Sequence, residues 1–467
     1  SNFQKSLVYK YEFRNVNDVT KSRNEFTFED NIPFINRVRI DYPDFFLKYP
    51  HERKLDFLFL DIEQYWQDGT MFPTFDDAIS AIGYAHNNNG IDVLLGDGKK
   101  DLDLLEEFTK IYRRINPDVI VGYNVKNYDL TTIFRRMKKN NISSKMLSKT
   151  REAPYVERML IPGVVAYDLY KSTSSDVSLV GKVRNLKAKT VAEYFDVPAI
   201  ELSPYEIRKS VGTEKQRKYC ASDVNLNIEF FRRYGPQLKF IAETLKISFN
   251  EVVDWSAYQL ATILHGEQLK KRGVVCDGSN KDRFPDIYSG GRPYFQAALT
   301  GIKRKGLFKP VVKVDFTSMY FLIELICNFS PDTTFLVGYE PLSKFGIKEF
   351  DSYYIYKIPD KRIGKNVVLK VLKKEGYVHD MLTSLFLERF KYKKKYSETG
   401  KKEWKSKSDG IKTVLLGSGW GVLGHITFPF GHYPTGIGIV GVGRVLNSML
   451  ISFDNEKDLG LKLLEYD

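Results

Sequence analysis

The sequence predicts an α/β protein with more than one domain. Between residues 58 and 235, short apolar runs alternate with segments of helical periodicity, which is the pattern of an α/β fold. The chain has 467 residues, and a single hydrophobic core rarely extends beyond about 250–300 residues. Hydrophobic residues make up 43% of the chain and charged residues 28%, so we expect most of it to be folded.

The expected elements follow the chain in a regular order. Two buried strands are predicted, LDFLFLDIE and PDVIVGYN. Three helices are predicted from their spacing, DLLEEFTKIYRRI, DLTTIFRRMKKN and EKQRKYCASDVNLNIEFFRRY. Residues 236–285 have a helical pattern as well, new strands are expected after YSGGRP, and a long basic helical pair is expected over roughly 378–424.

Charge and composition narrow the class of partner. The formal net charge of +13 favours a polyanion, most often nucleic acid. A membrane surface is the competing interpretation, but the sequence has neither an apolar run of 18 residues nor a signal peptide. The three cysteines (Cys220, Cys276 and Cys327) are scattered, which fits a reducing compartment and argues against disulfides or zinc. The six histidines are not paired at ligand spacing, so carboxylates and hard ions such as Mg²⁺ or Mn²⁺ are the expected metal chemistry.

A first set of candidate residues lies at the ends of predicted elements. Asp61 and Glu63 are two apart on a strand and therefore project to one face. Asp129 follows a strand-to-helix junction, and Tyr219 and Asp223 are four apart on one helical face. Each piece alone is more often an ordinary strand end or helix-surface contact. Together, four carboxylates would repel one another, and two divalent cations about 4 Å apart would resolve that conflict and catalyse phosphodiester hydrolysis.

A second set is basic. Between Arg389 and Lys407, nine of nineteen residues are lysine or arginine, and Arg389 and Lys393 lie about one helical turn apart. A solvated helix face is the usual explanation of such a run. Here aromatic residues interleave the charges, and the motifs on either side favour a functional role over a solvated face; these aromatic residues are Phe390, Tyr392, Tyr396 and Trp404.

In this order the motifs resemble those of family B DNA polymerases of the archaeal and viral type. DIE, GYNVKNYD and YCASD match the three motifs of the DEDDy 3′–5′ exonucleases. YSGGRP matches the Y-x-G-G loop that contacts template, and DFTSMY matches polymerase motif A. LERFKYKKK and TVLLGSGWG match the two finger helices, the second being motif B, and VGVGR resembles the palm helix that follows. The resemblance covers almost the whole chain.

The resemblance implies an α/β multi-domain fold, with an RNase H-like exonuclease domain, a right-hand palm and fingers, and no thumb. The implied divisions are a remnant of the N-terminal domain (1–57), the exonuclease domain (58–235), a helical connector (236–285), the first part of the palm (286–370), the fingers (371–424) and the second part of the palm (425–467).

The resemblance also implies the role of each residue. Four carboxylates and a tyrosine that orients water would form the exonuclease site: Asp61, Glu63, Asp129, Asp223 and Tyr219. Asp315 and Asp467 would hold two Mg²⁺ or Mn²⁺ ions for attack of a primer 3′-hydroxyl on a nucleotide α-phosphate. Tyr320 would lie under the sugar and exclude a 2′-hydroxyl. The other implied contacts are Arg389, Lys393 and Lys412 to nucleotide, and Asn124, Tyr288, Gly290, Gly291 and Arg444 to DNA.

Several positions depart from the family pattern. In motif B the usual lysine is Thr413, and Lys412 is one place earlier, which is a rotation of about 100° on a helix. Gly417 and Trp420 replace the usual asparagine and tyrosine, Phe321 replaces the proline of motif A, and Glu465 replaces the tyrosine of motif C. These changes affect nucleotide binding and rate rather than the metal ligands.

LLEYD aligns with the motif C strand, so the chain is expected to stop inside the polymerase site. A split polymerase completed by a second polypeptide, an intein break, a fragment of a longer protein, and a sequence that omits disordered parts all remain open. The resemblance implies primer-template DNA and deoxynucleotides as substrates, allows a sliding clamp as partner, and implies a cytoplasmic location, or a nuclear one in a eukaryote. An exonuclease or DNA-binding replication subunit with an inactive polymerase half is the alternative function, and a purely structural subunit is the third.

Overall fold

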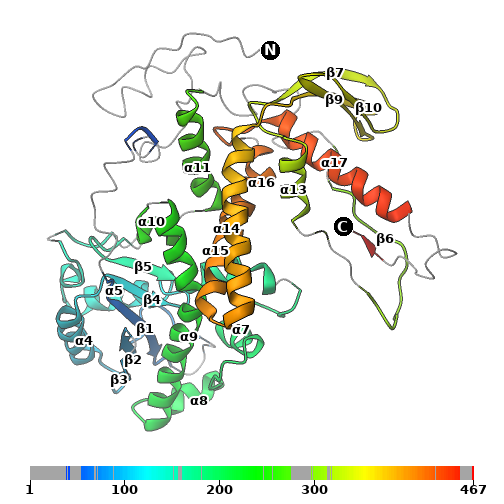
Figure 1. Cartoon of the computed structure of the whole chain (residues 1–467). Coiled ribbons are helices and arrows are strands. Elements are labelled where there is room, and N and C mark those ends of the chain that lie inside the picture. Colours follow the sequence, from blue (N-terminus) through cyan, green and yellow to red (C-terminus); the bar gives the residue numbers. More distant parts are fainter. Residues whose placement is uncertain are drawn as a thin grey trace. The chain divides into compact units, whose positions relative to one another are not determined.

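The computed structural model forms two compact units (Figure 1), Pro50–Asp254 and the combination of Ser1–Tyr49 with Trp255–Asp467. The structure describes residues 54–67, 72–87, 89–150, 160–179, 181–245, 247–254, 256–274, 298–312, 318–425 and 427–452, with residues 38, 40–42, 70, 152–155, 296, 316 and 465–466. A side chain within these ranges is left undescribed at a few positions, including 413–418 and 420. The two units are taken in turn.

A five-stranded mixed sheet forms the centre of the unit Pro50–Asp254, with the strand order β3-β2-β1-β4-β5. Its strands are β1 (Phe57–Gln64), β2 (Ile79–His86), β3 (Ile91–Leu95), β4 (Val119–Gly122) and β5 (Val165–Asp168). The first three strands pair antiparallel, whereas β4 runs parallel to both β1 and β5. The predicted α/β class is therefore confirmed, whereas β1, β2 and β3 follow one another without an intervening helix.

Each face of this sheet is covered by helices. On one face, Leu58, Leu60 and Ile62 of β1 pack against α4 (Leu102–Ile115) and α5 (Asp129–Lys139). On the other face, Phe59 packs in a second core with α7 (Ala188–Tyr194) and α9 (Glu214–Leu245). The shorter helices of this unit are η1 (Ser144–Leu147), α6 (Leu169–Ser174), η3 (Val177–Leu179), α8 (Pro204–Lys209) and α10 (Phe249–Asp254).

A buried ion pair joins β2, α4 and α5. Asp101 is fully buried and precedes α4, and its carboxylate accepts hydrogen bonds from Arg136 Nε (2.7 Å) and Nη2 (2.8 Å). The same carboxylate accepts hydrogen bonds from the Ile79 backbone N–H (3.0 Å) and from Asn140 Nδ2 (2.8 Å). These bonds satisfy the two buried charges and fix α5, whose first residue is Asp129.

Helix α9 approaches the sheet closely at a glycine. A Cβ atom on Gly83 of β2 would lie 2.7 Å from Cys220 Sγ and 2.8 Å from Val224 Cγ2, both on α9. Because real Cβ contacts are longer than this, only glycine allows α9 to lie at this depth. The close approach brings Tyr219 and Asp223, on the same helix, toward β1.

The second unit contains an antiparallel four-stranded sheet with the order β7-β10-β9-β8. Its strands are β7 (Thr334–Pro341), β8 (Gly346–Glu349), β9 (Tyr353–Asp360) and β10 (Lys365–Leu372). Residues of β9 and β10 share a core with α13 (Met319–Ile326) and α17 (Tyr433–Ser452). A two-stranded pair joins β6 (Gly301–Ile302) to β11 (Glu465–Tyr466), and the unit also contains helices α11 (Ala257–Lys271) and α16 (Trp420–Leu423).

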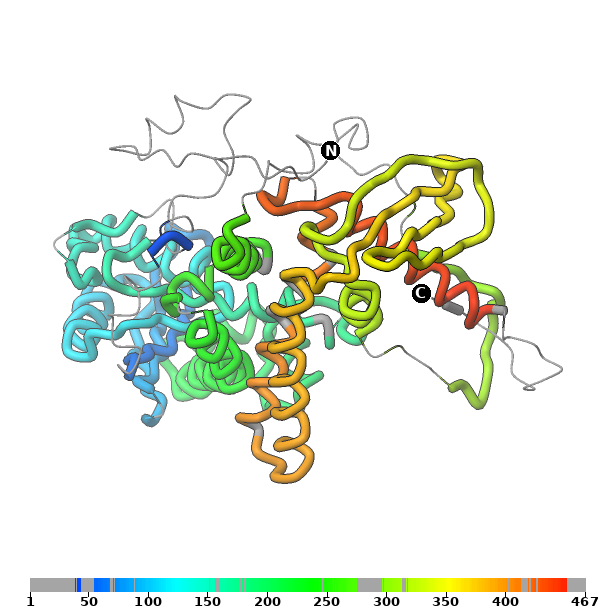
Figure 2. Tube along the Cα trace, turned by 45° about the horizontal axis from the view of Figure 1, so that its top comes forward, coloured from blue at the N-terminus to red at the C-terminus, as the bar shows by residue number. Residues whose placement is uncertain are grey.

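The predicted basic helical pair is present as α14 (Tyr377–Thr399) and α15 (Lys402–Ser418). The two helices lie side by side and are joined at Gly400, which has a positive φ of 65° (Figure 2). Tyr392 of α14 stacks on Trp404 of α15, with ring centroids 5.7 Å apart, and Lys395 lies 4.3 Å from the centroid of the Trp404 ring. Some of the interleaved aromatic residues therefore hold the hairpin together.

One helix of the described residues is long and apolar enough to cross a membrane, in contrast to the expectation from the sequence. It is the segment Tyr433–Ile451 of α17, and 67% of it is buried inside the protein. Because α17 packs on α13 and the four-stranded sheet, its apolar side chains are explained by the core that they form.

Candidate active sites

Three carboxylates converge on the face of the first sheet that α9 covers. One oxygen each of Asp61, Glu63 and Asp223 lies within 4.8 Å of the other two. Asp61 and Glu63 follow Phe59 at intervals of two along β1, so all three side chains project to the same face. Asp223 comes from α9, one helical turn beyond Tyr219. The sequence prediction that these residues meet is supported by this geometry.

Asp129 lies beside these three carboxylates rather than among them. It is 3% exposed at the start of α5, and its Oδ1 accepts a hydrogen bond from the Ile62 backbone N–H (3.1 Å). Burial, followed by the charges of Asp223, Asp129 and Glu63, raises the pKa of Asp61, which places the four predicted acids in one electrostatic group.

Burial and mutual repulsion hold protons on this group. Burial, followed by the charge of Asp223, raises the pKa of Asp61 and of Glu63 well above the usual range of a carboxyl. Burial raises the pKa of Asp129 to about 8 and that of Asp223 to about 6. In the absence of a cation, the site therefore disfavours the fully ionised state of these four acids.

The donors fit a divalent cation. Asp223 Oδ1 is buried and has no hydrogen-bond partner among the described residues, although a buried carboxylate oxygen normally has one. Oxygen ligands from carboxylates are those that Mg²⁺ and Mn²⁺ prefer, and a bound cation would offset the repulsion among the acids. Asp61, Glu63 and Asp223 are the residues that would hold it.

Lys189 is a member of the site that the sequence reasoning missed. Its Nζ donates a hydrogen bond to the Tyr219 hydroxyl (2.7 Å) and lies 3.3 Å from Asp223 Oδ2. The ammonium group also lies 3.9 Å from the centroid of the Tyr219 ring. Lys189 is on α7, one of several lysines in the stretch GKVRNLKAKT, and nothing in its spacing distinguishes it from the others.

Asp168 is a second residue that was missed. It ends β5 and is 9% exposed, and its Oδ1 accepts hydrogen bonds from the backbone N–H groups of Asn124 (2.8 Å) and Tyr170 (3.0 Å). Asn124 has a left-handed backbone with φ 61°, a conformation that asparagine tolerates better than most residues. Asp168 thus fixes the loop before Asp129. An apolar run that ends in an acid, VVAYD, was the available signal.

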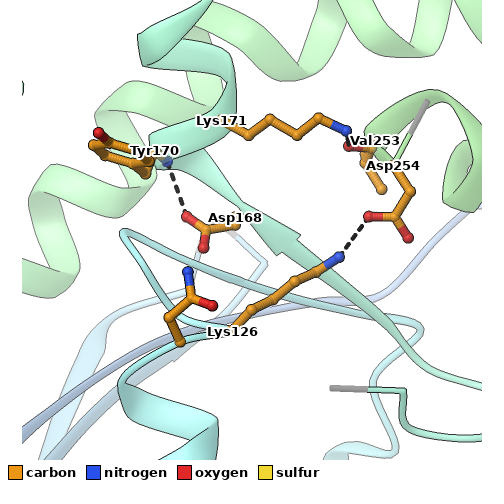
Figure 3. A pocket seen from close by; sticks show the side chains of 7 residues that line it. Lys126, Asp168, Tyr170, Lys171, Val253 and Asp254 are labelled. Atoms are coloured by element: carbon orange, nitrogen blue, oxygen red, sulfur yellow. Dashed lines mark hydrogen bonds and ion pairs between the residues drawn. The ribbon is translucent and has the colours of Figure 1, made fainter. Parts of the chain in front are cut away.

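A small pocket lies next to this loop (Figure 3), and its two lysines are already engaged. Lys126 Nζ lies 2.5 Å from Asp254 Oδ1, and Lys171 Nζ donates to the Val253 carbonyl (3.0 Å). Both acceptors are on α10. The pocket is therefore explained by the contacts that attach α10 to the edge of the sheet.

In the second unit, the hairpin formed by α14 and α15 contacts the residue that precedes α13. Arg389 Nη1 of α14 lies 3.5 Å from the hydroxyl of Ser318, directly before α13. Ser318 has a left-handed backbone with φ 56°, which is unusual for serine and is typical of functional segments. Burial lowers the pKa of Arg389, and its Nε is buried without a partner among the described residues. Lys393 lies one turn further along α14 and is exposed.

The structure describes some of the remaining predicted nucleotide-binding and DNA-binding residues and not others. Tyr320, on α13, and Lys412, on α15, are both half-buried. Arg444 is 6% exposed, and its guanidinium donates to the carbonyls of Gln296 and Pro359, so its charge serves contacts within the unit. The side chains of Thr413, Gly417 and Trp420 are not described. Five predicted residues lie outside the described residues: Tyr288, Gly290, Gly291, Asp315 and Asp467.

Comparison with known proteins gives one consistent result. Residues 11–188 match the family described as "DNA polymerase family B, exonuclease domain". A DNA polymerase of Thermococcus sp. (strain 9oN-7) is 23% identical over 495 residues, covering 98% of this chain and 59% of the relative. A DNA polymerase of Pyrococcus glycovorans is 26% identical over 429 residues, covering 83% of this chain and 50% of the relative.

The likeness extends to the fold. The structure of the family B DNA polymerase from Pyrobaculum calidifontis matches with a TM-score of 0.72 at 18% identity, covering 97% of this chain and 62% of that one. The chain spans between 23% and 59% of the length of three curated relatives that it matches, the DNA polymerases of Thermococcus hydrothermalis, Thermococcus sp. (strain 9oN-7) and Pyrococcus glycovorans. The family match, the relatives and the fold agree: residues 11–188 match the exonuclease domain of family B DNA polymerases, and the rest of the chain is similar to archaeal DNA polymerases in sequence and fold.

Proposed function

We propose that this chain is a DNA-templated DNA polymerase of family B, or a large part of one, with a 3′–5′ proofreading exonuclease in the unit Pro50–Asp254. The observation that carries the proposal is the convergence of Asp61, Glu63 and Asp223 beside Tyr219. An acid cluster with this burial is costly to maintain unless a cation offsets its charge.

In the exonuclease site, Mg²⁺ or Mn²⁺, two ions as in other two-metal nucleases, would activate water and stabilise the leaving 3′-oxygen. Asp61, Glu63 and Asp223 would hold the ions, with Asp129 beside them. Tyr219 would orient the attacking water. Lys189 donates to the Tyr219 oxygen, and the Tyr219 hydroxyl also interacts with Asp223, so these two neighbours would hold the hydroxyl in the orientation from which it positions the water.

In the polymerase site, Asp315 and Asp467 would be the metal ligands, and Tyr320 would lie under the sugar of the incoming deoxynucleotide. Arg389 and Lys393 would grip its triphosphate with charge-assisted hydrogen bonds, and Lys412 would add charge. The contact between Arg389 and Ser318 supports this assignment, because it places the arginine next to the motif A segment. Tyr288, Gly290, Gly291 and Arg444 remain proposed DNA contacts, together with Asn124 in the exonuclease unit.

The domain division stays a proposal as well: an N-terminal segment to residue 57, the exonuclease to 235, a connector to 285, the palm to 370, the fingers to 424, and the palm again to 467. Primer-template DNA and deoxynucleoside triphosphates are the proposed substrates, bound in a salt-sensitive manner. A sliding clamp as partner and a location in the cytoplasm, or in the nucleus of a eukaryote, complete the proposal.

The test uses a 5′-labelled primer annealed to a longer template, with Mg²⁺, in the presence and absence of deoxynucleotides. Shortening of the primer without deoxynucleotides, abolished in an Asp61→Asn variant, supports the exonuclease. Extension with deoxynucleotides, retained in that variant, supports the polymerase. Shortening in both lanes favours the alternative of an exonuclease without a working polymerase half, and no change in either lane contradicts both activities.

A further inference from the structure

Tyr320 rests directly on the backbone of helix α17. A Cβ atom on Gly443 would lie 2.9 Å from Tyr320 Cε1 and 3.5 Å from Met319 Cε. Separations below 3.0 Å are essentially absent from real Cβ contacts, so any side chain at position 443 would require the Tyr320 ring to move. The absence of a side chain at Gly443 therefore sets how deeply this ring is seated.

A ring that is displaced by a side chain at position 443 must move away from α17. Helix α17 is fixed at neighbouring positions, since Gly441 abuts Ile358 of β9 and Val442 is part of the core shared with that sheet. Tyr320 itself is only half-buried. Two residues before it, Ser318 faces the guanidinium of Arg389. Tyr320 therefore lies on the same segment as Ser318, whose hydroxyl contacts Arg389, the proposed triphosphate ligand.

We infer that Gly443 is a positioning residue for sugar selection, because it sets how far the Tyr320 ring projects toward the incoming nucleotide. The inference rests on the proposed polymerase function, in which Tyr320 lies under the sugar. A methyl group at position 443 pushes the ring into the space of the sugar. Deoxynucleotides then bind more weakly, and ribonucleotides, which carry an extra hydroxyl, lose more.

The same helix supplies a matched control. A Cβ atom on Gly438 would also lie 2.9 Å from an aromatic carbon, Cε1 of Phe329. Phe329 is fully buried in the core with Tyr356 and Ile358 and has no proposed contact with substrate. Gly438→Ala therefore introduces a similar steric conflict on the same helix without acting on Tyr320.

The experiment measures equilibrium binding of dATP and ATP to the full chain on a primer-template with a dideoxy-terminated primer, together with the melting temperature. Gly443→Ala is expected to weaken dATP binding by at least about threefold and to raise the preference for dATP over ATP, whereas Gly438→Ala leaves the preference unchanged. Tyr320→Ala is expected to lower the preference. In the Tyr320→Ala background, Gly443→Ala should have no further effect on binding, and it should lower the melting temperature by less than it does in the wild-type background.

The outcomes separate the two ideas. If Gly443→Ala changes the preference no more than Gly438→Ala, or acts equally in the Tyr320→Ala background, Gly443 does not act through Tyr320 and the inference is wrong. If the wild-type chain binds neither nucleotide, the proposed polymerase function fails and the inference fails with it. If Gly443→Ala folds too poorly for binding studies, recovery of its melting temperature by Tyr320→Ala supports the contact, and no recovery overturns it.

Discussion

The Nζ atom of Lys189 lies 2.7 Å from the hydroxyl oxygen of Tyr219 and donates a hydrogen bond to it. The same ammonium group lies 3.3 Å from Asp223 Oδ2. One side chain from α7 thus connects the tyrosine and a carboxylate of α9, which the sequence had placed in the site on their own.

Replacing Lys189 with methionine is expected to lower the rate constant of primer shortening about 10- to 100-fold. The change removes a charge-assisted hydrogen bond worth about 1.5–3 kcal/mol, and about 1.4 kcal/mol corresponds to a factor of ten in rate. Single-turnover digestion of a labelled single strand at saturating enzyme measures this rate constant. Lys189→Arg should retain more activity, and Lys187→Met, an exposed neighbour, should be nearly normal. Equal losses in all three variants would contradict a specific role.

Replacing Glu63 with glutamine is expected to weaken Mn²⁺ binding at least about 10-fold and to raise the melting temperature in EDTA. Burial and the charge of Asp223 raise the pKa of Glu63 in the metal-free fold, so at neutral pH ionisation of this carboxyl favours the unfolded chain, and the neutral amide removes that cost. Calorimetric titration with Mn²⁺ and melting in EDTA measure the two effects. Asp103→Asn, which removes an exposed carboxylate of α4, should change neither. Unchanged Mn²⁺ affinity in Glu63→Gln would exclude this residue as a ligand.

Replacing Asp101 with asparagine is expected to lower the free energy of unfolding by about 3–5 kcal/mol, because it leaves the Arg136 charge buried without its partner. Denaturant titration of the unit's unfolding transition measures the loss. Glu107→Gln is the control, since its pair with Lys110 (3.6 Å) is exposed and should contribute less than about 1 kcal/mol. Similar losses in the two variants would show that the buried pair contributes no more to the free energy of unfolding than the exposed pair does.

The same pair predicts a pH dependence. Burial raises the pKa of Asp101, but the hydrogen bonds from Arg136, the Ile79 N–H and Asn140 outweigh it and hold the pKa below its ordinary value. The stabilisation is therefore complete above the unfolded-state pKa of about 3.9 and is lost as the pH falls through the lower folded-state value. The difference in unfolding free energy between wild type and Asp101→Asn should shrink in that acidic range. A difference that stays constant down to the acid transition would contradict this assignment.

Replacing Gly83 with alanine is expected to lower the free energy of unfolding by about 1–3 kcal/mol, since the new methyl group would overlap Cys220 Sγ and Val224 Cγ2. Because α9 would have to move away from β2, primer shortening should slow as well. Gly90→Ala is the control, because a Cβ atom there meets nothing within 4 Å, and its effect should stay within about 0.5 kcal/mol. Normal digestion by a destabilised Gly83→Ala variant would show that the close approach of α9 to β2 is not required for primer shortening.

The sequence by itself determined which carboxylates could meet. The two-residue spacing of Asp61 and Glu63 puts both on one face of β1 in any register, and the four-residue spacing of Tyr219 and Asp223 puts both on one face of α9. Likewise β1, β4, α4, α5, α9 and the basic hairpin follow from local periodicity, whereas β2, β3 and β5 were not predicted, and the order of the motifs gave the resemblance to family B DNA polymerases. These features depend on neighbours in the chain, which spacing reports directly.

The tertiary structure alone decided which distant residues complete the sites. Lys189 reaches Tyr219 from 30 positions away, and Asp168 bonds to the Asn124 N–H from 44 positions away. Arg444, which is predicted to contact DNA, also donates to carbonyls of its own unit, and the absence of a side chain at Gly443 makes room for the ring of Tyr320. The sequence does not distinguish a lysine, arginine or glycine that faces solvent from one that faces a phosphate or a neighbouring ring. Only the packing of one element on another selects among these environments, because the contacts that decide them join segments far apart in the chain.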